Sequence, residues 1–134
     1  MNPETDPNPD LIYSYSRAQA IDDGVLIDVS DMARQAGFMV PVALTTAAWS
    51  DCVSWADADS RRQTPQDESG RLWDVVWMAY LATRRTAGSH VEVTLFRVPC
   101  DGCSRAARTA RLRMHIGPGD QGEPVITIMM PGED

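Results

Sequence analysis

Apolar residues follow helical spacing in one long internal segment of this chain and strand spacing in its last third. Over residues 72–82 only Asp74 carries a charge, and a helix without a polar face is normally buried. The run is shorter than the ~20 residues that a membrane-spanning helix needs. We therefore predict a long central core helix over residues 69–85, capped by Asp67 or Ser69.

The C-terminal third alternates apolar and polar residues with a period of two, which is typical of strands with one buried face. Three such segments are centred near Val93, Met114 and Ile128, and residues that favour turns separate them. They predict an antiparallel meander of three strands packed against helices. A shorter alternation over residues 25–29 predicts an extra short strand.

Capping residues predict shorter helices in the first half of the chain. Ser16 and Gln19 fit a capping box, in which each side chain accepts from a free backbone N–H of the first turn, and Gly24 ends this helix. Residues 31–36, capped by Ser30, predict a second helix. A third is predicted over residues 41–55 from apolar residues at helical spacing: Leu44, Ala48, Cys52 and Trp55.

These elements predict one α+β domain of about four helices, with the central core helix packed on the three-stranded meander. A chain of 134 residues is the usual size of a single domain, and we assign residues 11–134 to it. Residues 1–10 contain three prolines and three acids, which predicts a disordered tail. Residues 56–69 are mostly polar and are predicted as the longest loop.

The charge balance narrows the classes of partner. The net charge is −7, which argues against general binding to nucleic acid or membranes and suits an acidic protein that docks on a basic surface. All 12 basic residues are arginine, so lysine chemistry is excluded. The N-terminus lacks the apolar run of a signal peptide, which predicts a cytoplasmic protein with reduced cysteines.

Cys100 and Cys103 have the spacing of half a zinc site, which His90, His115 or Cys52 would have to complete. Zinc ribbons carry a second cysteine pair, and this chain has none. We therefore favour two free surface cysteines and predict no metal or cofactor.

A second candidate is the outward face of the predicted meander. A solvated face with cross-strand pairs accounts for its residues. Four cations on one surface of an acidic protein also suit an acidic partner or a phosphate backbone, which leaves a nucleic-acid accessory factor as an alternative. The residues expected on this face are Glu92, Thr94, Arg97, Arg111, Arg113, His115 and Thr127.

A third candidate surrounds the entrance of the central helix. The acidic residues Asp57, Asp59, Asp67 and Glu68 lie in or beside the predicted loop, and Arg71 follows them. A solvated loop explains them, while an acidic docking surface or a small metal-dependent hydrolase using these carboxylates are the alternatives. Four tryptophans at helical spacing are assigned to core packing rather than to base stacking: Trp49, Trp55, Trp73 and Trp77.

Three segments of the chain carry a family resemblance. They are residues 13–29, with Ala-Ile-Asp-Asp-Gly-Val-Leu-Ile-Asp-Val; residues 66–79, with Gly-Arg-Leu-Trp-Asp-Val-Val-Trp-Met; and residues 116–128, with Gly-Pro-Gly-Asp-Gln-Gly-Glu-Pro. Together they resemble a family of small bacterial proteins, classed as a domain of unknown function and encoded on plasmids, phages and integrated elements. The resemblance implies a genomic setting and no catalytic residues.

In that setting, short accessory proteins often counter host defences such as CRISPR effectors or restriction enzymes. The chain has no nucleophile elbow or glycine-rich phosphate loop, and only two histidines. We therefore expect a non-enzymatic interaction protein with a protein partner, and the genomic setting suggests inhibition of a defence effector by occlusion of its surface.

Overall fold

The computed structural model describes residues 15–133, and it confirms the α+β class. One sheet contains β1 (Leu26–Asp28), β2 (Val42–Thr45), β3 (His90–Arg97), β4 (Arg108–Pro118) and β5 (Pro124–Met129). The antiparallel meander β3–β4–β5 forms as predicted, but it is only part of the sheet. Its strand β5 also pairs in parallel with β2, and β2 pairs antiparallel with β1. The result is a mixed five-stranded sheet in the order β1-β2-β5-β4-β3.

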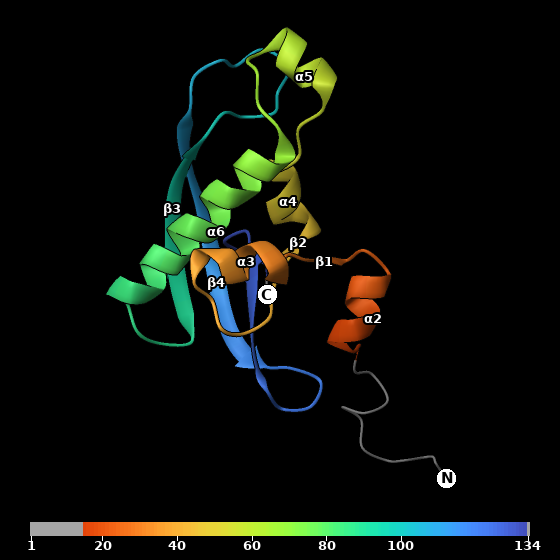
Figure 1. Cartoon of the computed structure of the whole chain (residues 1–134), viewed down its shortest axis with the longest axis vertical. Coiled ribbons are helices and arrows are strands. Elements are labelled where there is room, and N and C mark those ends of the chain that lie inside the picture. The colour runs from red at the N-terminus through yellow and green to blue at the C-terminus, as the bar shows by residue number, and fades with distance from the viewer. Residues whose placement is uncertain (1–14, 134) are drawn as a thin grey trace.

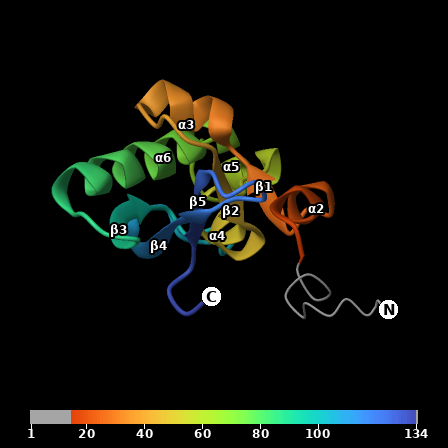
Figure 2. The same cartoon turned by 90° about the horizontal axis from the view of Figure 1, so that it is seen from below.

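Helices surround this sheet unevenly. They are α2 (Arg17–Asp22), α3 (Ser30–Ala36), α4 (Thr46–Cys52), α5 (Asp57–Arg62) and α6 (Glu68–Arg85). The long helix α6 and the short α3 lie side by side on one face of the sheet, whereas α2 lies beside β1 (Figure 2). Helix α5 stands at one end of the molecule, next to the β3–β4 connection (Figure 1). No helix within residues 15–133 is long and apolar enough to cross a membrane.

The predicted caps at two helices are confirmed. Ser16 accepts a hydrogen bond from the Gln19 amide and donates its own amide to the Gln19 side chain, both at 3.0 Å. Gly24 follows α2 with a φ of 77°, which favours glycine. The Asp67 carboxylate accepts from the Gly70 amide at 2.7 Å, and α6 starts one residue before the predicted position.

The third predicted helix is wrong over its first part. Residues 42–45 form the strand β2, and the helix α4 begins only after the Thr45 cap, whose hydroxyl accepts from the Ala48 amide at 3.2 Å. Val42, Ala43 and Leu44 are fully buried between strands β1 and β5. A strand buried on both faces has no alternation, so its apolar run is indistinguishable from part of a helix.

The predicted long loop is also wrong, because residues 57–62 form α5. Its polar residues stabilise it locally. The Asp59 carboxylate accepts from the Ala56 amide at 2.8 Å and pairs with Arg62 at 2.7 Å, one turn further on. Both bonds lower the pKa of Asp59, the backbone one most. Ser30, predicted as a cap, instead bonds Asp28 and the Val42 amide, and Val29 precedes the first turn of α3.

The core lies between α6 and the sheet. One face of the sheet contributes alternating buried residues: Val91, Val93, Leu95, Leu112, Met114, Ile126 and Ile128. Leu72, Val75, Val76 and Ala79 of α6 pack in the same cluster. The predicted tail at residues 1–10 lies outside the described part of the chain.

Candidate functional site

The outer face of α6 is exposed, although the sequence predicted a helix buried all round. Trp73 is 36% exposed and Trp77 is 39% exposed, and Asp74 lies in the open between them. Core packing is therefore wrong for these two tryptophans, while Trp55 is buried as predicted. The apolar run did not show which side faces water, because both sides of the helix are apolar.

The two exposed indoles and the half-buried Tyr80 ring form an ordered stack, which we call the aromatic ladder and define as Trp73, Trp77 and Tyr80. The two indoles are 5.8 Å apart between centroids with planes 11° from parallel, and Tyr80 continues the stack at 6.0 Å and 26°. Aromatic pairs in such geometry are stabilising by ~0.5–1.5 kcal/mol. The ladder is therefore a preformed surface rather than a set of separate side chains.

The C-terminal end of the ladder is anchored to its neighbours. Phe38 packs edge-on against Tyr80 at 5.6 Å and 79°, and the Arg84 guanidinium lies over the same ring and donates to its hydroxyl at 3.1 Å. Gly37 passes directly beneath the ring, where a Cβ atom would approach it within 2.6 Å. Its φ of 128° also requires glycine. Tyr80 is thus held in place by α3 and the residues that follow it.

The N-terminal end of the ladder opens into a hollow of about 370 Å³. Its lining residues are Gln66, Asp67, Gly70, Arg71, Trp73 and Asp74. Asp67 uses one oxygen as the helix cap, and Asp74 makes no hydrogen bond or ion pair within residues 15–133. Partial removal from water raises the pKa of Asp74, and the nearby Arg71 charge opposes that shift. The hollow is therefore lined by two carboxylates, one indole and the buried Arg71.

Arg71 lies under this hollow and joins several segments of the chain. It is only 4% exposed. Its guanidinium donates to the backbone oxygens of Val53 at 3.0 Å and Val98 at 2.9 Å and to the Gln66 side chain at 2.7 Å. It also lies 4.5 Å from the centroid of the Trp55 ring, while its Nη2 has no hydrogen-bond partner among residues 15–133. Burial lowers the pKa of Arg71, and the residue is a buried connector rather than the surface contact that the sequence predicted.

Arg97 was expected on the outward face of the sheet, and the structure corrects this. Its guanidinium points the other way and pairs with Asp51 of α4 at 3.1 Å. Side chains alternate between the two faces of a strand. Arg97 lies two residues after Leu95, which faces inward, so Arg97 faces inward as well. Beside this pair, burial and then the Asp51 charge raise the pKa of Cys52 to about 12, so Cys52 remains a thiol.

Apart from Thr127 on β5, the remaining predicted residues of the outward face do lie together on β3 and β4. Glu92 is directly opposite Arg113, and Thr94 is opposite Arg111. His90 and His115 are also paired, with ring centroids 4.6 Å apart. Phe96, which the sequence analysis left out of this face, is 68% exposed on it.

The predicted acidic cluster is not brought to one point. Asp59 and Asp67 are used within their own helices, and Glu68 accepts a hydrogen bond from the Trp55 amide at 3.3 Å. Asp57 is exposed in the first turn of α5. Within residues 15–133, no three carboxylate, histidine or cysteine side chains are grouped so that they could hold a metal ion.

Cys100 and Cys103 are free and exposed in the β3–β4 connection. His90 begins β3 and Cys100 lies beyond its other end, so at ~3.3 Å per residue they are more than about 20 Å apart. Burial and then the Asp59 carboxylate raise the pKa of Cys100, which disfavours its thiolate. The cysteine pair and this histidine cannot share one metal ion.

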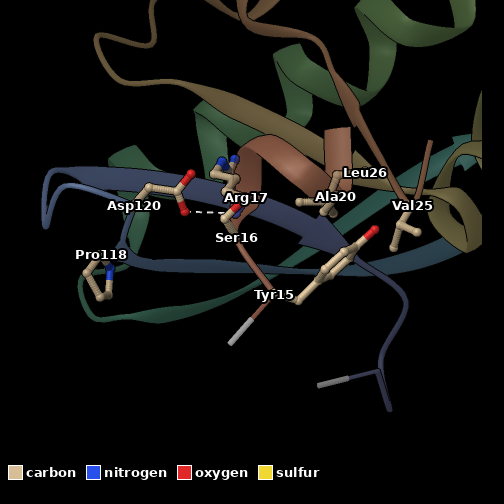
Figure 3. A pocket seen from close by; sticks show the side chains of 9 residues that line it. Tyr15, Ser16, Arg17, Ala20, Val25, Leu26, Pro118 and Asp120 are labelled. Atoms are coloured by element: carbon tan, nitrogen blue, oxygen red, sulfur yellow. Dashed lines mark hydrogen bonds between the residues drawn. The ribbon is translucent and has the colours of Figure 1, made fainter. Parts of the chain in front are cut away.

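Another hollow, of about 640 Å³, lies between α2 and the β4–β5 hairpin (Figure 3). Its polar groups already have partners. The Asp120 carboxylate accepts from the amides of Arg17 and Ala18 at 2.8 and 3.0 Å, which lowers its pKa. The Arg17 guanidinium donates to Thr127 and to the Ile126 oxygen at 2.8 and 2.6 Å. This hollow therefore serves to attach α2, and Arg17 covers the Thr127 that was predicted to be open.

Comparison with known protein families gives one match, which covers residues 5–134. The chain belongs to a family of unknown function, DUF6573. Neither the curated proteins nor the solved structures give a match. The family assignment agrees with the predicted resemblance to an uncharacterised domain, and the geometry must carry any functional argument for this DUF6573 protein.

Sequence patterns missed one buried polar residue of this DUF6573 protein. The Gln63 side chain donates to the oxygens of Pro99 at 2.7 Å and Ser104 at 2.5 Å and accepts from the Gly102 amide at 3.1 Å. Asp101 completes the loop by accepting bonds from Ser104 and Cys103, which lower its pKa. A lone glutamine in a polar segment gives no sequence signal for such a role.

Proposed function

We propose that this protein is a non-enzymatic interaction protein that binds a protein partner through the outer face of α6. The observation that carries the proposal is the exposed, prestacked aromatic ladder. Tryptophan, tyrosine and arginine are the residue types that dominate binding energy at protein interfaces. Here Trp73, Trp77, Tyr80 and Arg84 lie together along one helix face.

The rigidity of the ladder supports this proposal. A binding surface loses less conformational entropy when its side chains are already ordered. The stacking of the two indoles and the packing of Tyr80 on Phe38 supply that order. An exposed apolar surface of this kind is costly in a soluble chain unless it is used.

We propose further that the partner is an effector of a host defence system, such as a CRISPR or restriction complex, and that the protein inhibits it by occlusion. This step rests on the resemblance to proteins of plasmids, phages and integrated elements and on the absence of a recognisable catalytic motif. It is an analogy at the level of genomic setting.

The test is phage survival in bacteria that carry a CRISPR or restriction system and express this chain. We expect phage to survive in cells that express the native chain. In cells that express the double variant Trp73→Ala, Trp77→Ala, phage survival and capture of the effector should both be lost. Met39→Ala is the matched control, because Met39 is 96% exposed and lies outside the ladder. No protection by the native chain, or full protection by the folded double variant, contradicts the proposal.

A second candidate function follows from the exposed Phe96 on the same face as Arg111 and Arg113. An aromatic ring beside cations is the arrangement that binds single-stranded nucleic acid, through stacking and phosphate contacts. A salt-dependent gel shift that disappears in Arg111→Ala, Arg113→Ala supports this function. A gel shift that persists in the double variant contradicts it.

A further inference from the structure

We propose that the partner presents a basic surface and inserts one arginine or lysine side chain into the hollow at the N-terminal end of the aromatic ladder. This inference rests on the proposed function, because it specifies the chemistry of the partner at that same surface. The groups that recognise the cation are the Asp67 and Asp74 carboxylates and the Trp73 ring.

The lining of the hollow fits a side-chain cation. A guanidinium or ammonium group is attracted both to carboxylates and to the face of an indole. Asp67, Asp74 and Trp73 all line the same space of about 370 Å³. That volume is near the lower end of the range for small-molecule pockets, and one long side chain fits it.

Asp74 is the residue that most needs such a partner. Arg71, three residues earlier, has its donors directed at the Val53 and Val98 oxygens and at Gln66, and forms no ion pair with Asp74. Asp74 is thus a partly desolvated carboxylate without an ion-pair partner beside an aromatic surface. A cation from another protein supplies the missing charge.

Charge complementarity supports the same partner at two scales. The whole chain has a net charge of −7, which attracts basic surfaces. Asp67, Glu68 and Asp74 lie at the N-terminal part of α6 together with the buried Arg71, whereas Arg84 and Arg85 lie in the last turn. A partner with a basic residue facing Asp74 and an uncharged or acidic region facing Arg84 is therefore bound in one direction along the ladder.

The first test uses small probes on the full chain. Titration with N-acetylarginine amide, followed by two-dimensional NMR, is expected to shift the Trp73 indole N–H in a saturable way, and Trp73→Phe identifies that signal. The same titration with N-acetylglutamate amide is expected to leave it in place. Asp74→Asn should weaken the arginine response about threefold. Equal responses to both probes, or none at Trp73, overturn the inference.

Two further variants distinguish binding of the cation in the hollow from general attraction by the net charge and from effects on folding. Asp67→Asn removes the carboxylate charge but keeps a good helix cap, so its effect reports on the hollow and not on α6 stability. Asp57→Asn changes the net charge equally on the exposed surface of α5 and should leave the arginine response unchanged. A loss of response in Asp57→Asn equal to that in Asp74→Asn shows general attraction only and overturns the inference.

The second test uses effector capture by the full chain. Loss of capture in both the ladder double variant and the double variant Asp67→Asn, Asp74→Asn supports the inference. Loss in the ladder variant with full capture by the carboxylate variant overturns this inference alone and leaves the proposed function standing. Capture that survives the ladder variant overturns both.

Discussion

The two faces of α6 have nearly the same apolar character and opposite roles. The inner face contributes small and branched residues to the core, among them Val75, Val76 and Ala79, all fully buried. The outer face carries larger rings, Trp73 and Trp77, which remain over a third exposed. The larger residues are therefore on the outside, so the size and apolarity of a side chain do not show that it contributes to the core.

Two charged residues one turn apart show the same contrast. Arg71 is buried, and its hydrogen bonds go to backbone oxygens and to Gln66 rather than to a carboxylate. Asp74 lies on the exposed face, is partly removed from water, and forms no hydrogen bond or ion pair within residues 15–133. Arg71 therefore connects segments within the domain, whereas Asp74 is accessible to a partner molecule.

The largest effect on stability is expected from removing the charge of the buried Arg71. Arg71→Ala leaves the oxygens of Val53 and Val98 without these donors, and buried unsatisfied groups cost ~1–3 kcal/mol each. We expect the free energy of unfolding to fall by about 3 to 5 kcal/mol in urea titrations. The free energy of unfolding of Arg71→Lys should lie between those of the native chain and Arg71→Ala, because an ammonium group lacks the planar fork of donors. Arg61→Ala, on an exposed arginine, should change stability by less than about 0.5 kcal/mol.

The next largest effect is expected from the core side of the helix. Val76→Ala removes two buried methyl groups from a fully buried position. We expect a loss of about 2 kcal/mol, from transfer free energy and the cavity that remains. Urea unfolding with an unchanged slope checks this value, and a loss below about 0.5 kcal/mol, typical of a surface substitution, contradicts the assignment of the inner face.

Trp77→Ala removes far more atoms than Val76→Ala, yet we expect a loss of similar size. The ring stacks with Trp73 and Tyr80, and each such pair is worth about 0.5–1.5 kcal/mol. In the same urea titration we therefore expect a loss of about 2 kcal/mol, which is much less per removed atom than for Val76→Ala. A loss above about 4 kcal/mol, typical of a fully buried tryptophan, means that the ladder belongs to the core and argues against an interaction surface.

The smallest expected change in stability comes from Asp74→Asn, which should stabilise the fold rather than destabilise it. The pKa of Asp74 is raised in the folded state, so its ionised form is less favourable there than in the unfolded chain. Asp74→Asn should therefore slightly raise the melting temperature at neutral pH. The difference in melting temperature between the variant and the native chain should shrink as the pH falls through the pKa of Asp74, because the native side chain then becomes neutral as well. A lower melting temperature of the variant at neutral pH means that the carboxylate supports the fold.

Several elements were predictable because their signals are local. The Ser16 capping box, the Asp67 cap and the alternation of β3, β4 and β5 are set by neighbours in the chain, and each is present. The strand β2 was not predictable in this way. Its pairing with β5 is a tertiary contact, and its residues lie between two other strands.

The candidate site was predictable in position but not in composition. The entrance of α6 was singled out, and Asp67 does line the hollow there. Arg71 was placed on the surface because its neighbours are polar, although its hydrogen-bond acceptors come from distant segments. One signal for the ladder was available: Asp74 is the only charge in the apolar run, and it marks the solvent face that Trp73 and Trp77 share.

The position of β5 in the sheet has a consequence for how the chain is made. This strand is the last to be synthesised, yet it lies between β2 and β4. Until residues 124–129 have left the ribosome, the strand pairs β1–β2 and β3–β4 lack the strand that joins them, and each pair has an unpaired inner edge. Such edges readily pair with other chains. A nascent chain that is cut short before residue 124 is therefore expected to aggregate, and the native sheet to assemble only after β5 has been synthesised.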